Sequence, residues 1–219
     1  MKIASWNVNS LNVRLPHLQR WLDEAKPDVV ALQETKQEDH KFPEDALLAA
    51  GYRNIFTGQK TYNGVAILAK HSITDAQLGI PGFDDVQARA IAATVNDVRI
   101  INLYVVNGQD IGTDKYAYKL RWLAAVREWV ADEMTRHPQL VVMGDFNIAP
   151  DDRDVPDAAV WNDNHILTST AERAALKRLL DLGLHDAFRL HHDDAGIFSW
   201  WDYRAAGFRR NLGLRIDLT

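Results

Sequence analysis

The sequence predicts an α/β fold with a mixed sheet, and three features of the chain lead to this prediction. Short apolar strands alternate with amphipathic helical stretches along its 219 residues. Two segments also share one design, in which a helical stretch, a proline and an apolar strand lead to an acid seven residues after the proline. Pro27 and Glu34 mark the first segment, and Pro138 and Asp145 mark the second. The turn residues Asn96-Asp97 join two further strands, which adds an antiparallel pair.

The N-terminal part of the chain predicts a strand, a helix and a second strand. Residues 2–9 alternate in polarity, and this strand presents Asn7 and Asn9 near its C-terminal end. Leucines at positions 11, 15, 18 and 22 recur at helical spacing, and Pro27 ends that helix. Residues 29–33 then form an apolar strand that leads directly to Glu34.

The rest of the chain predicts strands over residues 63–69, 89–95 and 98–105, followed by a long helix over 115–136. The tryptophans of this helix, Trp122 and Trp129, are interpreted as core residues rather than ligand contacts. An irregular polar stretch follows at 151–168. Ser169 and Glu172 have the spacing of a capping box, which predicts a helix that closes at Gly183.

Composition predicts a globular cytoplasmic protein. A hydrophobic content of 47% and the absence of a linker-like stretch favour one domain over residues 1–219. The chain has no cysteine, which excludes disulfides and thiolate metal sites. No apolar run approaches the length of a membrane span, and the N-terminus resembles a strand rather than a signal peptide. A net charge of −5 excludes a generally basic surface, although a local basic face would still attract a polyanion.

The segment from Leu140 to Pro150 indicates a functional site. Four apolar residues predict a buried strand, and Gly144 marks its transition to a loop that carries Asp145 and Asn147. A carboxylate beside an amide suits a divalent metal or a phosphate, whereas Gly, Asp and Asn are also ordinary turn residues. The equivalent acid Glu34, at the end of an equivalent strand, favours the site.

The strand ends and loops together present many oxygen and amide groups and few nucleophiles. Such a set favours Mg²⁺-assisted attack of water on a phosphodiester, and it argues against zinc. The candidates are Asn7, Asn9, Glu34, Tyr104, Asn107, Asp145, Asn147 and Asp217.

Six motifs in a fixed order resemble those of the exonuclease III family of abasic-site endonucleases, within the endonuclease/exonuclease/phosphatase superfamily. They cover the chain nearly from end to end. The motifs are Ser5-Trp6-Asn7-Val8-Asn9, Leu32-Gln33-Glu34-Thr35-Lys36, Tyr62-Asn63-Gly64-Val65-Ala66, Tyr104-Val105-Val106-Asn107-Gly108, Gly144-Asp145-Phe146-Asn147-Ile148 and Leu214-Arg215-Ile216-Asp217.

The resemblance implies a four-layered α/β sandwich of two similar halves, as in DNase I. It also implies a monomer that uses Mg²⁺ or Mn²⁺ to cleave duplex DNA 5′ to abasic sites, with 3′-to-5′ exonuclease and 3′-phosphatase activities. Glu34 would be the principal metal ligand with help from Asn7. Asp145 would align or deprotonate the attacking water, and Asn147 and Tyr104 would hydrogen-bond the scissile phosphate. Asp145 and Asn147 are also candidate metal ligands.

DNA contacts follow from the same resemblance. Arg89, Asn107 and Lys115 would contact the backbone. Trp200, Leu214 and Ile216 match an apolar pocket for a flipped-out abasic sugar, which is small enough to enter where an intact nucleotide is not. For Trp201 and Phe208 we expect core packing instead.

Two positions depart from the family pattern. Val106 occupies a position where the family usually has proline. In the family, Asp217 is a catalytic residue that orients a histidine from a later Ser-Asp-His motif, whereas the present sequence stops at Thr219. We therefore expect the domain to be incomplete at its C-terminus, without its terminal strands, and to cleave slowly.

Two alternatives to the repair nuclease stay open on the sequence. One is a superfamily phosphodiesterase or phosphatase that acts on a lipid or inositol phosphate. Lys115, Trp200 and the basic segment Phe208-Arg209-Arg210 count against it. The other is a catalytically weak DNA-binding remnant. The balance between endonuclease and exonuclease activity and the number of metal ions are not set by the sequence.

Overall fold

The computed structural model describes residues 1–219, with Ala205 described by its backbone alone. The chain divides into two compact units. Unit 1 comprises Met1–Tyr104 and Asp132–Asp145, and unit 2 comprises Val105–Ala131 and Phe146–Thr219. The helix α3 (Asp114–Arg136) passes from unit 2 into unit 1.

Unit 1 contains the helices α1 (Leu11–Ala25) and α2 (Glu44–Ala49) and the short 3-10 helix η1 (Asp39–Lys41). Its strands are β1 (Ile3–Asn7), β2 (Val29–Gln33), β3 (Arg53–Thr57), β4 (Val65–Ala69), β5 (Ile73–Leu78), β6 (Ala90–Val95), β7 (Val98–Tyr104) and β8 (Leu140–Asp145).

These strands form two mixed sheets. The first has the order β1-β2-β4-β3, with β1 and β2 parallel and the other neighbours antiparallel. In the second sheet β8, β7, β6 and β5 follow one another, with β7 and β8 parallel. The predicted turn at Asn96-Asp97 is confirmed, because Val95 pairs with Val98 across it.

The two sheets of unit 1 pack face to face over one apolar core. Strands β2 and β4 are buried along their whole length, which explains why their sequences are nearly continuous apolar runs. The core contains Val29, Ala31, Val65, Ile67 and Ala69 from the first sheet and Ile91, Ala93, Val95, Ile100 and Met143 from the second.

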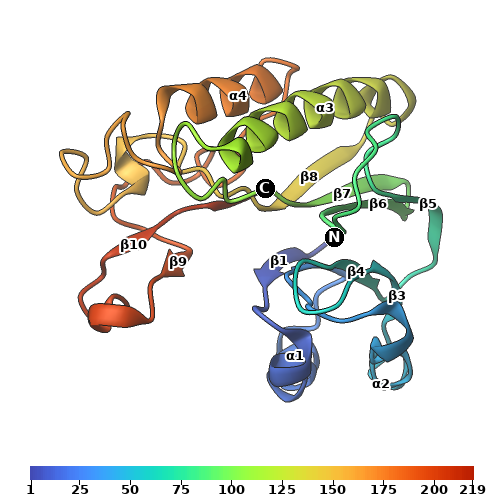
Figure 1. Ribbon diagram of the computed structural model, residues 1–219. Helices are drawn as coiled ribbons and strands as arrows, with labels where there is room; N and C mark the ends of the chain where they lie inside the picture. The colour runs from blue at the N-terminus through green and yellow to red at the C-terminus, as the bar shows by residue number, and fades with distance from the viewer. The chain divides into compact units, whose positions relative to one another are not determined.

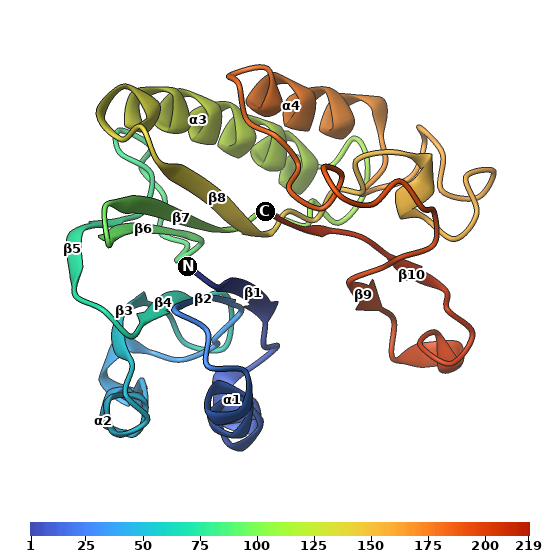
Figure 2. The ribbon, with the colours of Figure 1, turned by 180° about the vertical axis from the view of Figure 1, so that it is seen from behind.

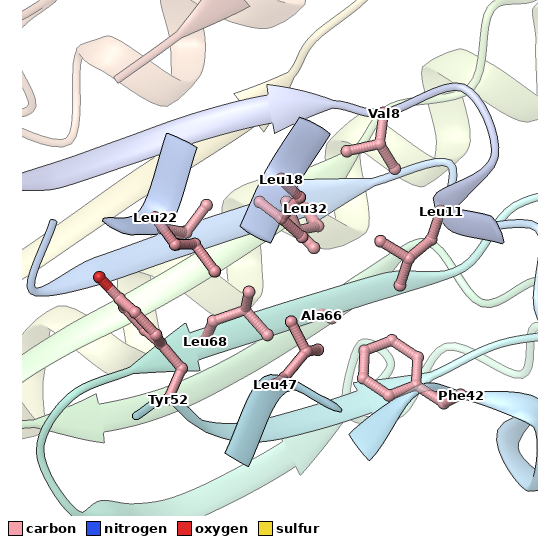
Figure 3. Close-up of a cluster of buried hydrophobic side chains, with 11 residues drawn as sticks. Val8, Leu11, Leu18, Leu22, Leu32, Phe42, Leu47, Tyr52, Ala66 and Leu68 are labelled. Atoms are coloured by element: carbon pink, nitrogen blue, oxygen red, sulfur yellow. The ribbon is translucent and has the colours of Figure 1, made fainter. Parts of the chain in front are cut away.

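The helices α1 and α2 cover the other face of the first sheet (Figures 1 and 2). Leu18 and Leu22 of α1 and Leu47 of α2 pack against Leu32 and Leu68 of the sheet (Figure 3). The leucine spacing that predicted α1 is therefore the spacing of its buried face.

Unit 2 contains the first part of α3, the helix α4 (Thr170–Leu180), the 3-10 helices η2 (Asp152–Asp154) and η3 (Arg204–Ala206), and the short strands β9 (Trp200–Trp201), β10 (Gly213–Leu214) and β11 (Asp217–Leu218). Helices α3 and α4 lie side by side, and β9 and β10 form an antiparallel pair (Figures 1 and 2). The capping box predicted for Ser169 and Glu172 is confirmed at the start of α4.

Local signals predicted the longer helices and most of the longer strands of both units, whereas α2, β3, β5, the short strands β9 and β10 and the 3-10 helices were not anticipated. Trp122 and Trp129 are buried as expected, and Trp201 is half-buried. The expectation for Phe208 was wrong, because its side chain is 74% exposed and meets Trp201 edge-on at a ring distance of 5.0 Å. Within the described part of the chain, no helix combines the length and apolar character needed to span a bilayer.

Candidate active site

Two parallel strand pairs in unit 1 bring four of the predicted site residues to strand ends. Asn7 ends β1 beside Gln33 of β2, and Glu34 follows β2 directly. Tyr104 ends β7 opposite Asp145, which ends β8. The carboxyl ends of parallel strands lie at one edge of a sheet, which is where α/β proteins commonly bind ligands.

A hydrogen bond between two of these residues links the two sheets. The Nδ2 of Asn7 donates to Oδ2 of Asp145 at 2.8 Å. The Oδ1 of Asn7 accepts the backbone N–H of Asn9 at 3.0 Å, which fixes the orientation of the amide. Asp145 is 5% exposed. Asn7, whose own amide is fixed by Asn9, therefore fixes the direction of the Asp145 carboxylate.

Glu34 lies in the loop after β2, beside a lysine. Lys36 Nζ is 3.0 Å from Glu34 Oε1 and donates to Asn9 Oδ1 at 2.7 Å. Glu34 and Lys36 both have left-handed backbone conformations, with φ values of 58° and 54°. Such conformations cost free energy in residues with a Cβ and cluster at functional sites. This loop holds a half-buried carboxylate next to a positive charge.

Tyr104 is kept protonated by its surroundings. Burial raises the pKa of its hydroxyl, and the negative charges of Glu34 and Asp145 raise the pKa further. The Arg89 guanidinium lies 4.7 Å from the centre of the Tyr104 ring and donates to the Tyr104 carbonyl at 3.2 Å. Tyr104 is thus a neutral hydrogen-bond donor beside two carboxylates.

In unit 2 two predicted asparagines contact each other. Asn107 Nδ2 donates to Asn147 Oδ1 at 3.1 Å, and Asn147 Nδ2 donates to the Val105 carbonyl at 3.0 Å. Asn147 is 6% exposed and has a left-handed φ of 49°. Lys119 donates to the backbone carbonyls of both asparagines.

The half-buried side chain of Asp217 has a raised pKa. Burial raises its pKa to about 6, against the opposing effect of a hydrogen bond with Ser199. The backbone N–H groups of Ile216 and Asp217 donate to Ser199 Oγ at 3.1 and 3.0 Å. Ser199 therefore fixes the backbone that carries the Asp217 side chain.

The residues predicted to receive the abasic sugar lie in unit 2 with different exposures. Leu214 and Ile216 are buried in an apolar cluster with Leu167, whereas Trp200 is 38% exposed. Lys115 is exposed near the start of α3.

The donor atoms of unit 1 fit a hard divalent cation. Glu34 and Asp145 supply carboxylate oxygens, and the chain has no thiolate. Among the described residues, no three acidic or histidine side chains gather closely enough to hold a metal ion by themselves. Carboxylate oxygens are ligands that hard divalent cations prefer, and such a cation often keeps several waters beside one or two carboxylates.

The residues that sequence reasoning missed are charged groups inside the structure. Lys119 forms a buried ion pair with Glu172. The sequence assigned Glu172 to a helix cap and gave Lys119 no role. A lysine within a helix that also carries many apolar residues was the available signal, but a solvated position explains that pattern equally well.

Comparison with known proteins places this arrangement in a family. The profile of the Endonuclease/Exonuclease/phosphatase family matches residues 4–219. The exodeoxyribonuclease III of Haemophilus influenzae is 34% identical over 229 residues, which cover 99% of this chain and 86% of that protein.

Two solved structures share the fold over the whole of this chain and 85% of their own length. The 3′ phosphatase NExo from Neisseria, bound to a product DNA hairpin, is 50% identical with a TM-score of 0.98. An AP endonuclease from Archaeoglobus fulgidus is 37% identical with a TM-score of 0.95. The predicted α/β class and its DNase I-like architecture are confirmed by these neighbours.

Proposed function

This chain belongs to the endonuclease/exonuclease/phosphatase family as a DNA-repair nuclease of exonuclease III type, and from that premise we propose that it hydrolyses duplex DNA 5′ to abasic sites with Mg²⁺ or Mn²⁺. We include 3′-to-5′ exonuclease and 3′-phosphatase reactions in the proposal. The observation that carries it is the hydrogen bond from Asn7 to Asp145 between the strand ends that also present Glu34 and Tyr104.

Asp145 is the proposed base that aligns or deprotonates the attacking water. Its bond from Asn7 fixes the direction of the carboxylate, so that one oxygen is oriented to accept a proton from the water. Tyr104 keeps its proton because its pKa is raised, so it serves as a hydrogen-bond donor to a phosphate oxygen. Asn147 is the proposed second donor to that phosphate, with its amide oriented by Asn107 and Val105.

Glu34 is the proposed principal metal ligand, with Asn7, Asp145 and Asn147 as further candidates. When bound, the divalent ion supplies positive charge to the phosphate as negative charge develops on it. Lys36 lies 3.0 Å from Glu34, so a cation already balances this carboxylate in the protein. We expect Lys36 to limit the metal affinity of Glu34.

The proposed DNA contacts are Arg89, Asn107 and Lys115 for the backbone and Trp200, Leu214 and Ile216 for the abasic sugar. A DNA substrate is supported by the Neisseria neighbour, which was solved with a DNA hairpin. Asp217 is the proposed group that supports proton transfer, since a carboxyl with a pKa of about 6 changes charge near neutral pH. We further propose that residues 1–219 belong to one catalytic domain and that the protein is a monomer.

The 3′-phosphatase reaction is a second candidate for the main activity, because the neighbour at 50% identity is described by that activity. Both reactions attack a phosphate ester with water and need the same groups. They differ in whether the phosphate lies within a strand or at its 3′ end.

The test uses three duplexes, which carry an internal abasic-site analogue, a 3′ phosphate and a recessed 3′ hydroxyl. Cleavage is measured with Mg²⁺ and with EDTA. We expect Mg²⁺-dependent turnover of at least the first two, and Asp145→Asn should lower it on the order of 1,000-fold. Lys177→Ala, on the surface of α4, is the matched control. Equal rates with EDTA, or equal rates for Asp145→Asn, would refute the proposal.

A further inference from the structure

Lys119 lies on α3 with its side chain fully buried, and its ammonium group contacts three oxygens. Its Nζ donates to the Asn147 carbonyl at 2.7 Å and to the Asn107 carbonyl at 3.1 Å, and it pairs with Glu172 Oε1 at 2.5 Å. A lysine ammonium has three protons and no acceptor. Each of these oxygens can accept one of the ammonium protons.

Glu172 is itself fixed on its other side. Its Oε2 accepts from the backbone N–H of Ser169 at 3.2 Å and from Ser169 Oγ at 2.6 Å. Tyr116 Oη lies within hydrogen-bonding distance of the same Oγ, at 2.7 Å. The ammonium group is thus anchored to the first turn of α4 through side chains that have little freedom to move.

The two carbonyls belong to segments that have no regular structure of their own. Asn107 follows β7 in a loop, and Asn147 follows β8 with a left-handed backbone. Gly108 lets the first loop approach the lysine, because its φ is +94° and a Cβ at this position would lie 3.1 Å from Lys119 Cδ. These loops carry the asparagines whose side chains bond to each other.

We propose that Lys119 is a positioning residue that sets the directions of the Asn107 and Asn147 side chains by holding both backbone carbonyls. The inference rests on the proposed function only for the step from side-chain direction to catalysis. A buried ion pair is often replaceable by neutral residues without loss of stability, so stability alone does not explain this one. A neutral pair would lose the ammonium hydrogen bonds to the carbonyls of Asn107 and Asn147.

The decisive variant is Lys119→Met with Glu172→Gln. It removes both charges together, and the introduced amide still has an oxygen that accepts from Ser169, so the capping of α4 survives. The matched control is Arg99→Met with Glu133→Gln, which neutralises the buried pair of unit 1. We expect kcat to fall on the order of 100-fold in the first and to stay within about twofold of the parent in the second, because small misplacements of a catalytic group have effects of that size.

A second measurement keeps the inference testable without turnover. The side-chain amide signals of Asn107 and Asn147 in ¹⁵N-correlated NMR spectra should shift or broaden in the Lys119 double variant and stay unchanged in the Arg99 double variant. If the Lys119 double variant fails to fold, Glu172→Gln alone serves. It keeps the ammonium bonds to the carbonyls, so the two amide signals should keep their parent positions although the thermal stability falls.

The outcomes distinguish a failure of the positioning role of Lys119 from a failure of the proposed function. Parent-like kcat and unchanged amide signals in the Lys119 double variant would overturn the inference and make the pair purely structural. Displaced amide signals in Glu172→Gln would also overturn it. A parent protein that cleaves none of the three duplexes refutes the proposed function, and the amide signals then decide the positioning role separately.

Discussion

Arg99–Glu133 in unit 1 and Lys119–Glu172 in unit 2 are both buried ion pairs with nitrogen–oxygen distances of 2.5 Å. Their cations differ in where the remaining donors go. Arg99 joins the start of β7 to the end of α3 and donates to the Asp75 carbonyl of β5, all within the scaffold. Lys119 donates to the loops that carry two site residues. Burial alone therefore does not distinguish a structural charge from one that positions site residues. The acceptors of its other hydrogen bonds make that distinction.

Removing one partner of a buried ion pair should lower the free energy of unfolding more than any other change considered. Lys119→Met leaves the buried Glu172 carboxylate without its buried cation, which we expect to cost about 3–5 kcal/mol of unfolding free energy. Arg99→Met should cost less, because Glu133 keeps its ion pair with Arg136 at 2.9 Å. Urea denaturation at pH 7.5 measures this loss. The second neutralising change, Glu172→Gln or Glu133→Gln, should restore part of it in both units. A loss below about 1 kcal/mol would mean that water reaches these sites and that the pairs are weak.

The fold around both pairs was largely predictable, because it depends on local patterns. The leucines of α1 mark its buried face, and the runs before Glu34 and Asp145 are the strands β2 and β8. The exposed position of Phe208 was not predictable in this way, since hydrophobicity alone does not say whether a residue near a pair of short strands faces the core.

The site was predictable as a set of residues but not as a set of contacts. Strand ends and motifs indicated Asn7 and Asp145, yet the bond between them joins positions 138 residues apart. Lys119 and Glu172 are 53 residues apart, and each has an ordinary explanation on its own helix. Long-range pairing of charges depends on tertiary packing, and a single sequence does not encode it as a local pattern.

Gly108→Ala should perturb the Lys119 pair moderately from the loop side. The variant combines an unfavourable positive φ with a Cβ that would lie 3.1 Å from both Lys119 Cδ and Ile166 Cδ1. We expect it to lower the unfolding free energy by about 1–3 kcal/mol and to lower kcat as well. Gly51→Ala is the matched control, because Gly51 has a φ of +85° and open space around its Cβ position. Equal losses in thermal melts and equal kcat values for both variants would show that the close contacts with Lys119 and Ile166 contribute nothing.

Asp217 contrasts with both pairs, because burial rather than a partner dominates its titration. Its pKa is raised from 3.8 to about 6, so folding favours the protonated form. The stability it contributes is complete below pH 3.8 and is lost as the pH rises through about 6. Asp217→Asn should therefore stabilise the protein by about 1–2 kcal/mol at pH 7.5 and by almost nothing at pH 4. Denaturation at both pH values tests the sign, and a variant less stable at pH 7.5 would contradict it.

The smallest effect should come from an ion pair on the surface of the same helix that carries Glu172. Lys177 and Asp181 are 2.7 Å apart at i,i+4 spacing at the end of α4, but both side chains are more than half exposed. Water and salt screen such a pair, so Lys177→Ala should change the unfolding free energy by less than about 0.5 kcal/mol. Urea denaturation in low and in high salt gives the measurement. A loss as large as that of Lys119→Met would mean that nitrogen–oxygen distance, rather than burial, sets the energy of these pairs, and the contrast between surface and interior would fail.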